Sequence, residues 1–249
     1  MIILRFLNSM KIVEAQWEKR NLKKRVFEIE IEISDNVTSI QKALQDLTAD
    51  YVVIKLSTKL HSFIDPIQTF GFKFIELITH TKYEGQLPEL NAIEERFLAY
   101  VSANRISQSN LNKLRDQINS GMFQTDRISL DAEFGKEFSA RRYLGMIEDE
   151  CSRGAQIYQI SFEDQMIGFF VLREVSQGLF LSSLGGIFPN FQNKGFGVLM
   201  NYFQIYKSFE SGGNQIYSTF SSNNLGATAI HWRFNYSLAN QEYIFIKHY

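Results

Sequence analysis

Residues 187–200, with the sequence IFPNFQNKGFGVLM, combine residue types that suit anion binding. An apolar run and a proline lead into two glycines, Gly195 and Gly197, and a stretch with helical spacing follows. The first N–H groups of a helix are unpaired and lie at the positive end of its dipole. Glycine leaves room for an approaching anion, while Lys194 adds positive charge and Gln192 a side-chain amide. We predict a phosphate or pyrophosphate at this turn; a tight strand-to-helix connection is the alternative.

Neither of two common phosphate-loop patterns, G-x-x-x-x-G-K-[ST] and G-x-G-x-x-G after a first strand, is present. The turn instead resembles the GNAT acetyltransferase superfamily, whose signature is met by Ile187, Pro189, Gln192, Gly195 and Gly197. The resemblance implies that loop amides hold the pyrophosphate of acetyl-CoA while the preceding strand pairs with its pantetheine arm. Gly185 and Gly186 are expected to clear a path for it. The implied cofactor-binding residues are Gly185, Ile187, Gln192, Asn193, Lys194, Gly195, Phe196, Gly197, Val198 and Asn224.

A second segment that resembles this family lies downstream, in register at Asn224, Ala227, His231, Asn235 and Tyr236. His231 stands where the family usually has the Tyr that protonates the leaving thiolate. Since the reference pKa of His is nearer neutrality than that of Tyr, we predict His231 as the catalytic acid. A histidine that packs or caps inside the helix is the alternative. Asn224 is expected to contact the pantetheine or to cap the helix.

A general base is harder to place, because the strand LFLSSLGGIF carries no carboxylate and only the hydroxyls of Ser182 and Ser183. A lysine-like amine, with a pKa near ~10.4, is about a thousandth unprotonated at neutral pH. A less basic amine, such as one on a sugar ring, would therefore suit this enzyme. A water chain or Glu174 is the alternative source of a base.

The segments ADYVVIKLS…GFKFIEL and DRISLDAEFGKEFSARRYLGMIEDE resemble two-domain sugar-nucleotide N-acetyltransferases of the TDP-fucosamine acetyltransferase type. The surroundings of Trp17 depart from that pattern. The resemblance implies a nucleotide-linked amino sugar as acceptor, held by cationic and aromatic groups at Arg127, Arg141, Arg142 and Tyr143. An ordinary solvated helix face is the alternative for the arginines. Open alternatives for function are acetylation of a small amine, amino acid or protein N-terminus, and acyl-CoA binding without catalysis.

The composition argues against several other classes of function. The 249 residues carry a formal charge of -1, without the basic excess of a nucleic-acid-binding protein. Cys151 is the single cysteine and the four histidines have no ligand spacing, so we expect no metal. No apolar run has the length of a membrane span, and the first residues lack the features of a leader peptide. We expect small-molecule substrates and a cytoplasmic location, and a homodimer is left open.

The hydrophobic periodicity predicts an α/β (α+β) protein. The resemblance implies that it has the GNAT fold, a mixed central sheet flanked by helices. A smaller N-terminal GNAT-like α/β domain is expected in residues 1–90 and the acetyltransferase domain in 91–249. The expected strands are 26–33, 51–57, 73–83, 96–106, 155–163, 165–174, 178–188, 214–222 and 242–249. The expected helices are 34–47, 64–72, 107–121, 134–150, 197–210 and 224–234. The alternation of apolar and acidic residues in 26–33 predicts a half-exposed strand.

Overall fold

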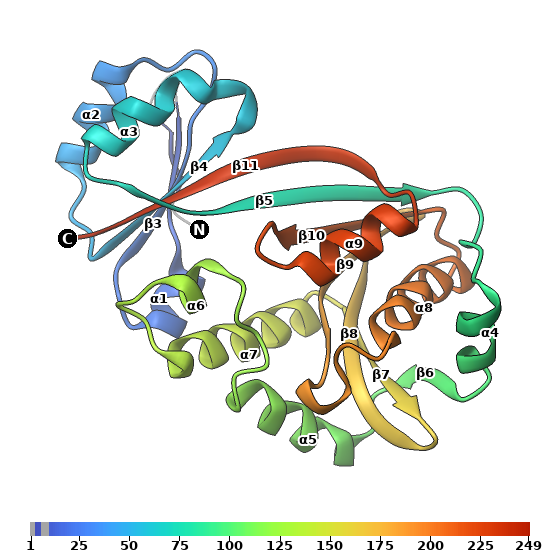
Figure 1. Cartoon of the computed structure of the whole chain (residues 1–249). Coiled ribbons are helices and arrows are strands. Elements are labelled where there is room, and N and C mark those ends of the chain that lie inside the picture. Colours follow the sequence, from blue (N-terminus) through green and yellow to red (C-terminus); the bar gives the residue numbers. More distant parts are fainter. Residues whose placement is uncertain (1–2, 6–9) are drawn as a thin grey trace.

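The computed structural model describes residues 3–5, as backbone only, and residues 10–249. Within them, eleven strands form one mixed sheet in the order β1-β2-β3-β4-β11-β5-β10-β9-β8-β7-β6 (Figure 1). Helices lie against both faces of this sheet, which confirms the predicted mixed α/β architecture.

The strands are β1 (Ile3–Arg5), β2 (Lys11–Glu14), β3 (Val26–Glu30), β4 (Tyr51–Ser57), β5 (Lys73–Glu84), β6 (Val101–Arg105), β7 (Gln156–Phe162), β8 (Gln165–Ser176), β9 (Leu179–Ile187), β10 (Gln215–Ser221) and β11 (Ser237–His248). The α-helices are α1 (Gln16–Leu22), α2 (Val37–Asp46), α3 (Ile64–Thr69), α4 (Ala92–Leu98), α5 (Gln108–Asn119), α6 (Arg127–Leu130), α7 (Lys136–Ser152), α8 (Phe196–Glu210) and α9 (Leu225–Arg233). Two 3₁₀ helices are η1 (Thr58–Phe63) and η2 (Pro189–Phe191).

The predicted elements are confirmed in order and type, with two exceptions. A strand was expected from residue 96, but Asn91 and Glu94 form a capping box that begins helix α4, and β6 starts only at Val101. The half-exposed strand predicted at 26–33 is wrong in burial, because Glu28 and its neighbours in β3 are buried. The ammonium group of Lys55, 2.7 Å from a Glu28 oxygen, balances that charge.

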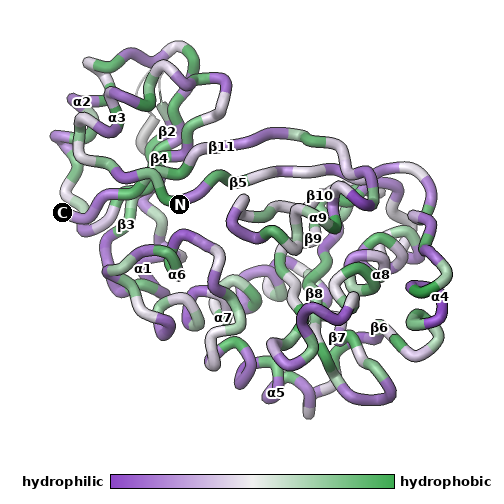
Figure 2. The backbone as a smooth tube through the Cα atoms, in the orientation of Figure 1, coloured by the Kyte–Doolittle hydropathy of each residue, from purple (hydrophilic) through white to green (hydrophobic). Residues whose placement is uncertain are grey.

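The two faces of the central sheet bury alternate residues of each strand, as the period of two requires. In β8, Phe170 and Leu172 pack in a cluster with residues of α8, whereas Phe169 and Val171 pack with residues of α5 and α7. Strands β3 and β4 are largely hydrophobic in Figure 2 because they too are covered on both faces. No helix in the described part of the chain is long and apolar enough to cross a bilayer.

Strand β11, near the C-terminus, lies between two strands of the N-terminal third. It is antiparallel to β4 on one side and to β5 on the other, and β5 in turn pairs with β10. The two predicted domains, 1–90 and 91–249, therefore share one hydrogen-bonded sheet (Figure 1). Strand β11 pairs with β4 and β5, and β10 pairs with β5. This connection brings side chains of β5 next to the end of β10.

Candidate active site

Strands β9 and β10 begin as a parallel pair and then diverge. Leu179–Ser182 pair with Gln215–Ser218, after which neither strand pairs with the other (Figure 1). Strand β9 keeps its pairing with β8 as far as Ile187, with a β-bulge at Ser183 that turns the strand. One edge of β9 beyond Ser182 is therefore free of strand partners. We call the space between the diverging ends, from Ser182 and Ser218 onward, the β9–β10 gap.

The turn from β9 to α8 presents a row of backbone donors. The described structure records no acceptor for the backbone N–H groups of residues 193–197. Asn193 and Gly195 have φ of 61° and 85°, and both are exposed. A Cβ at Gly195 would meet nothing within 4 Å, so it is the positive φ that favours glycine there. The turn can thus offer several amides, at the positive end of the α8 dipole, to one anion.

The side chains of this turn hold its shape. Gln192 donates from Nε2 to the carbonyl oxygen of Ile187 over 3.0 Å. Lys194 donates from Nζ to the carbonyl oxygen of Asn190 over 2.9 Å. The sequence suggested both side chains as anion ligands, but in the structure each bonds to the turn itself. Lys194 is exposed and still adds positive charge beside the amides.

Gly185 and Gly186 are explained by packing, which differs from the expected clearance of a cofactor path. A Cβ on Gly185 would lie 3.1 Å from Nε2 of Gln204 in α8. A Cβ on Gly186 would lie 2.9 Å from Cε of Met122, on the opposite face of the sheet. Because neither glycine has a Cβ, the side chains of Gln204 and Met122 can pack closely against β9, the strand that borders the gap.

The start of α8 also lies close to α9. A Cβ on Gly197 would stand 3.0 Å from Cδ1 of Ile230 in α9, so glycine allows the close approach of the helices. The side chain of Phe196 is buried in the core, so its backbone alone faces the turn. Val198, also expected at the cofactor, packs beside this core. Asn224 caps α9, since its Oδ1 accepts from the backbone N–H of Ala227 over 3.0 Å.

His231 is buried in α9, with 4% of its surface exposed. Its Nδ1 donates to the carbonyl oxygen of Ala227 over 2.7 Å, and no partner for Nε2 is found among the described residues. The ring lies between Phe220 and Tyr236, with centroids 4.5 and 4.4 Å away. Burial lowers the pKa of His231 to about 4. At neutral pH the Nε2 atom therefore carries a lone pair, which argues against the predicted role of this residue as a proton donor.

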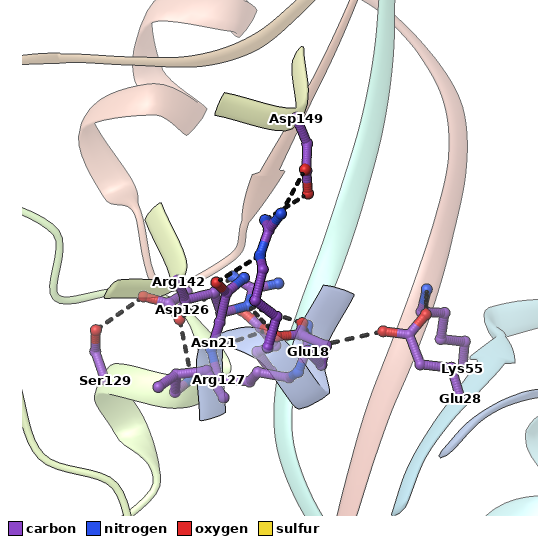
Figure 3. A network of polar contacts seen from close by, with 12 residues as sticks. Glu18, Asn21, Glu28, Lys55, Asp126, Arg127, Ser129, Arg142 and Asp149 are labelled. Atoms are coloured by element: carbon purple, nitrogen blue, oxygen red, sulfur yellow. Dashed lines mark hydrogen bonds and ion pairs between the residues drawn. The ribbon is translucent and has the colours of Figure 1, made fainter. Parts of the chain in front are cut away.

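Arg127 and Arg142, expected at the acceptor, belong to a buried ion-pair network (Figure 3). Arg127 donates to Glu18 and lies 3.4 Å from Glu28, while Arg142 donates to Glu18 over 2.8 Å. Asp126 lies 3.9 Å from Arg142. These carboxylates neutralise both guanidinium groups and join α1 to α6 and α7. Arg127 is thus buried and Arg142 mostly buried, and the carboxylates already occupy the guanidinium groups that were expected to bind a diphosphate.

Arg141 and Tyr143 differ from each other in position. Arg141 is paired with Glu137 one turn before it, at 2.5 Å, as on an ordinary helix surface. Tyr143 is buried and stacks on Phe123, with centroids 4.1 Å apart. Phe123 in turn would be 3.4 Å from a Cβ on Gly186. Of the four residues predicted to bind the acceptor, Tyr143 is the one that these contacts connect to the β9–β10 gap.

Glu76 on β5 was missed by the sequence analysis. Its side chain is 2% exposed, and Oε1 accepts from the backbone N–H of Arg127 over 3.1 Å. Oε2 has no hydrogen-bond partner in the described structure. The signal was a single carboxylate among the apolar residues of the expected strand segment KFIELI. Among the described residues, no three His, Cys, Asp or Glu side chains are grouped to hold a metal ion.

No protein-family model and no curated protein sequence matches the chain. Solved structures do match it over almost its whole length. The GCN5-related N-acetyltransferase from Sphaerobacter thermophilus superposes with a TM-score of 0.61 at 10% identity, over 96% of this chain and 76% of that one. The chain has the GNAT fold.

Two further structures support that assignment. A conserved protein of unknown function from Staphylococcus epidermidis ATCC 12228 matches with a TM-score of 0.64 at 12% identity, over 99% of this chain and 94% of that one. The tandem GNAT protein from the clavulanic acid biosynthesis pathway matches with a TM-score of 0.55 at 10% identity, over 90% and 75%. At such identities the likeness establishes the GNAT fold, and the chemistry has to be argued from this chain's own residues.

Proposed function

We propose that this chain is an acetyltransferase that moves the acetyl group of acetyl-CoA to an amine. The observation that carries the proposal is the β9–β10 gap, which leads directly into the exposed amides of residues 193–197. A GNAT fold on its own would allow many ligands, whereas an unpaired strand edge that ends at an anion-binding turn fits one elongated molecule with a phosphate end.

The chain's groups fit the parts of acetyl-CoA in order. The amides of residues 193–197 would bind the pyrophosphate, with Lys194 adding charge. The free edge of β9 beyond Ser182 would pair with the amide groups of the pantetheine arm, in the place that β10 leaves open. Acetyl-CoA supplies an activated acetyl group, and the chain has to position an amine and manage its protons.

An amine is proposed as the acceptor, without a defined scaffold. Phe123 and Tyr143 form an aromatic wall near Gly186, which fits a flat or ring-shaped group. A nucleotide-linked amino sugar is the finer alternative, but Arg127 and Arg142 are already paired with carboxylates. It is therefore tested beside other amines.

Acyl-CoA binding without turnover is the second candidate function. The observation that favours it is His231, whose buried neutral ring has no proton on Nε2 to give to a thiolate.

The deciding experiment combines titration calorimetry with acetyl-CoA and an assay of thiol release. The amine panel includes nucleotide-linked amino sugars, amino acids, polyamines and peptides with a free N-terminus. We expect acetyl-CoA to bind and thiol to appear only when an amine is present. Binding without thiol release from any amine would favour the second candidate, and a failure to bind acetyl-CoA would refute both.

A further inference from the structure

Strand β9 brings no carboxylate to the β9–β10 gap, yet a neutral amine is the form that attacks a thioester. Most amines are protonated near neutral pH, so a proton acceptor is needed. We propose that Glu76, on strand β5, accepts the proton of the incoming amine. This inference rests on the proposed acetyltransferase function and identifies the general base of that same site.

The strand register places Glu76 across β10 from the β9–β10 gap, level with the open end of the gap. Ile78 of β5 is opposite Ser221 of β10, and Glu76 is on the same face two residues away. Ser221 is three residues beyond Ser218, the last residue of β10 that pairs with β9. Glu76 therefore lies where β9 and β10 have already separated, on the opposite side of β10 from β9.

The segment of residues 122–127 contacts both β9 and β5. At one end, Met122 lies against Gly186 of β9; at the other, the backbone N–H of Arg127 donates to Glu76. Five residue-to-residue steps lead from Met122 to Arg127, so the two ends are at most about 18 Å apart when the segment is fully extended. Gly186 and Glu76 thus contact the two ends of one short segment, which carries the aromatic side chain of Phe123 between those ends.

Glu76 has a free oxygen in this region. Oε2 is buried without a partner among the described residues, although buried polar atoms in proteins are nearly always bonded. The Ser221 hydroxyl, which accepts from the backbone and side-chain nitrogens of Asn223 over 3.3 and 3.2 Å, is near enough to lower the pKa of Glu76 but leaves Oε2 without a hydrogen bond. A ligand N–H would complete the set, and an amine provides one.

The surroundings of Glu76 raise its basicity. Burial, the largest effect, raises the pKa of Glu76, and Asp126 raises it further. Ser221 and Arg127 act in the opposite direction by stabilising the carboxylate. Tyr143 in α7 is the other titratable group coupled to Glu76, and its own pKa is raised by burial, which keeps it neutral. A carboxylate with a raised pKa is a better base for an ammonium group than an exposed one.

The proton transfers balance as follows. Glu76 takes one proton from the ammonium group, and the neutral amine forms a bond to the thioester carbon. The C–S bond then breaks, and the second proton on the nitrogen goes to the sulfur, which gives the amide and free CoA thiol. Glu76 returns its proton to water. No other oxidant, reductant or co-reactant is needed.

Glu174, the base suggested by the sequence, is in a different place. It is exposed, and its Oε1 accepts from the backbone N–H of Gly178 over 3.0 Å in the hairpin between β8 and β9. That hairpin is at the end of β9 where β9 and β10 are still paired, opposite to the gap. Glu174 is therefore a matched control, a carboxylate on the neighbouring strand that does not face the gap.

The test compares the wild type, Glu76→Gln and Glu174→Gln across a pH series, with thiol release from the best amine of the panel as the readout. We expect Glu76→Gln to lower kcat by about 100-fold or more near neutral pH, since a general base contributes roughly 10²–10⁴-fold. The KM for acetyl-CoA should not change. As the pH falls, protonation of Glu76 should lower the activity of the wild type. This acid limb of the pH–activity profile should be absent in Glu76→Gln and present in Glu174→Gln.

Two further measurements separate a chemical role from a structural one. Infrared difference spectra between acid and neutral pH should show a protonated buried carboxyl that is missing in Glu76→Gln. Glu76→Asp keeps the carboxylate but draws it back by one methylene, so we expect a reduced kcat with the acid limb retained. If Glu76→Gln does not fold, as judged by thermal unfolding, Glu76→Asp carries the test, and loss of its acid limb refutes the role.

The outcomes also separate this inference from the proposed function. A wild type that binds acetyl-CoA but releases no thiol with any amine refutes both. A wild type that turns over, with Glu76→Gln equally active and its acid limb intact, refutes the role of Glu76 and leaves the acetyltransferase standing.

Discussion

Burial of the His231 imidazole makes the free energy of unfolding depend on pH. Its folded pKa of about 4 lies below the ordinary value of 6.5, so the unfolded chain binds the proton more readily. The stability that comes from keeping His231 neutral in the folded state is fully present above pH 6.5 and is lost as the pH falls toward 4. The loss amounts to free energy on the order of 3 kcal/mol.

The variant His231→Asn tests this difference. An Asn amide can still donate to the carbonyl oxygen of Ala227, but it does not titrate. Urea unfolding of both proteins at about pH 7.5 and about pH 4 should show a smaller loss of stability in the variant, by roughly 3 kcal/mol. An equal loss in the two proteins would show that His231 is not held neutral by the fold.

For single residues, the spacing of a local motif predicted the structure better than the residue types alone did. The glycines of the turn and the cap at Asn224 could be predicted, because both are local patterns. The pairing of Arg127 and Arg142 with Glu18 could not, since more than a hundred residues separate the partners along the chain. In a sequence, a pair of arginines resembles an anion-binding site until its tertiary partners are known.

Among the elements, the turn into α8 gives a prediction with a control inside the same chain. Gly195 and Gly154 both have a positive φ, 85° and 94°, and a Cβ on either meets nothing within 4 Å. An alanine at either position has to adopt the left-handed region, which costs about 1–2 kcal/mol. Both variants should therefore lose similar stability in denaturant unfolding.

Acetyl-CoA binding should distinguish the two variants. Gly195→Ala disturbs the amides of residues 193–197, and we expect its affinity to fall by roughly tenfold, or about 1.4 kcal/mol, in titration calorimetry. Gly154 is beyond the end of α7, so Gly154→Ala should bind like the wild type. Equal affinities for all three proteins would remove the turn from the proposed site.

Element order was predictable because periodicity and capping are local, as the N-cap of α5 at Ser107, the first residue of the expected helix 107–121, illustrates. Helices α1 and α6 escaped prediction because they are short, with seven and four residues, and have little periodicity to detect. The place of β11 between β4 and β5 is a property of long-range pairing, and nothing in its own sequence encodes its neighbours.

For the whole molecule, the two predicted domains share their stabilising contacts. Strand β11 needs β4 and β5 for its hydrogen bonds, and Glu18 of α1 neutralises two buried arginines on α6 and α7. If the N-terminal part unfolded alone, Arg127 and Arg142 would lose the Glu18 carboxylate they share, and β11 would lose both of its neighbouring strands. Removing one partner of a buried ion pair costs about 3–5 kcal/mol, so such a partly unfolded state is unfavourable.

The chain therefore should unfold in one cooperative transition, and its two tryptophans allow a direct test. Trp17 reports on the N-terminal part and Trp232 on α9, so Trp232→Phe and Trp17→Phe leave one fluorescent probe each. We expect the two variants, corrected for any common shift in stability seen by circular dichroism, to give coincident denaturant midpoints and slopes. A Trp17 signal that changes at lower denaturant than the Trp232 signal would show that residues 1–90 unfold as a separate unit, in spite of the shared sheet.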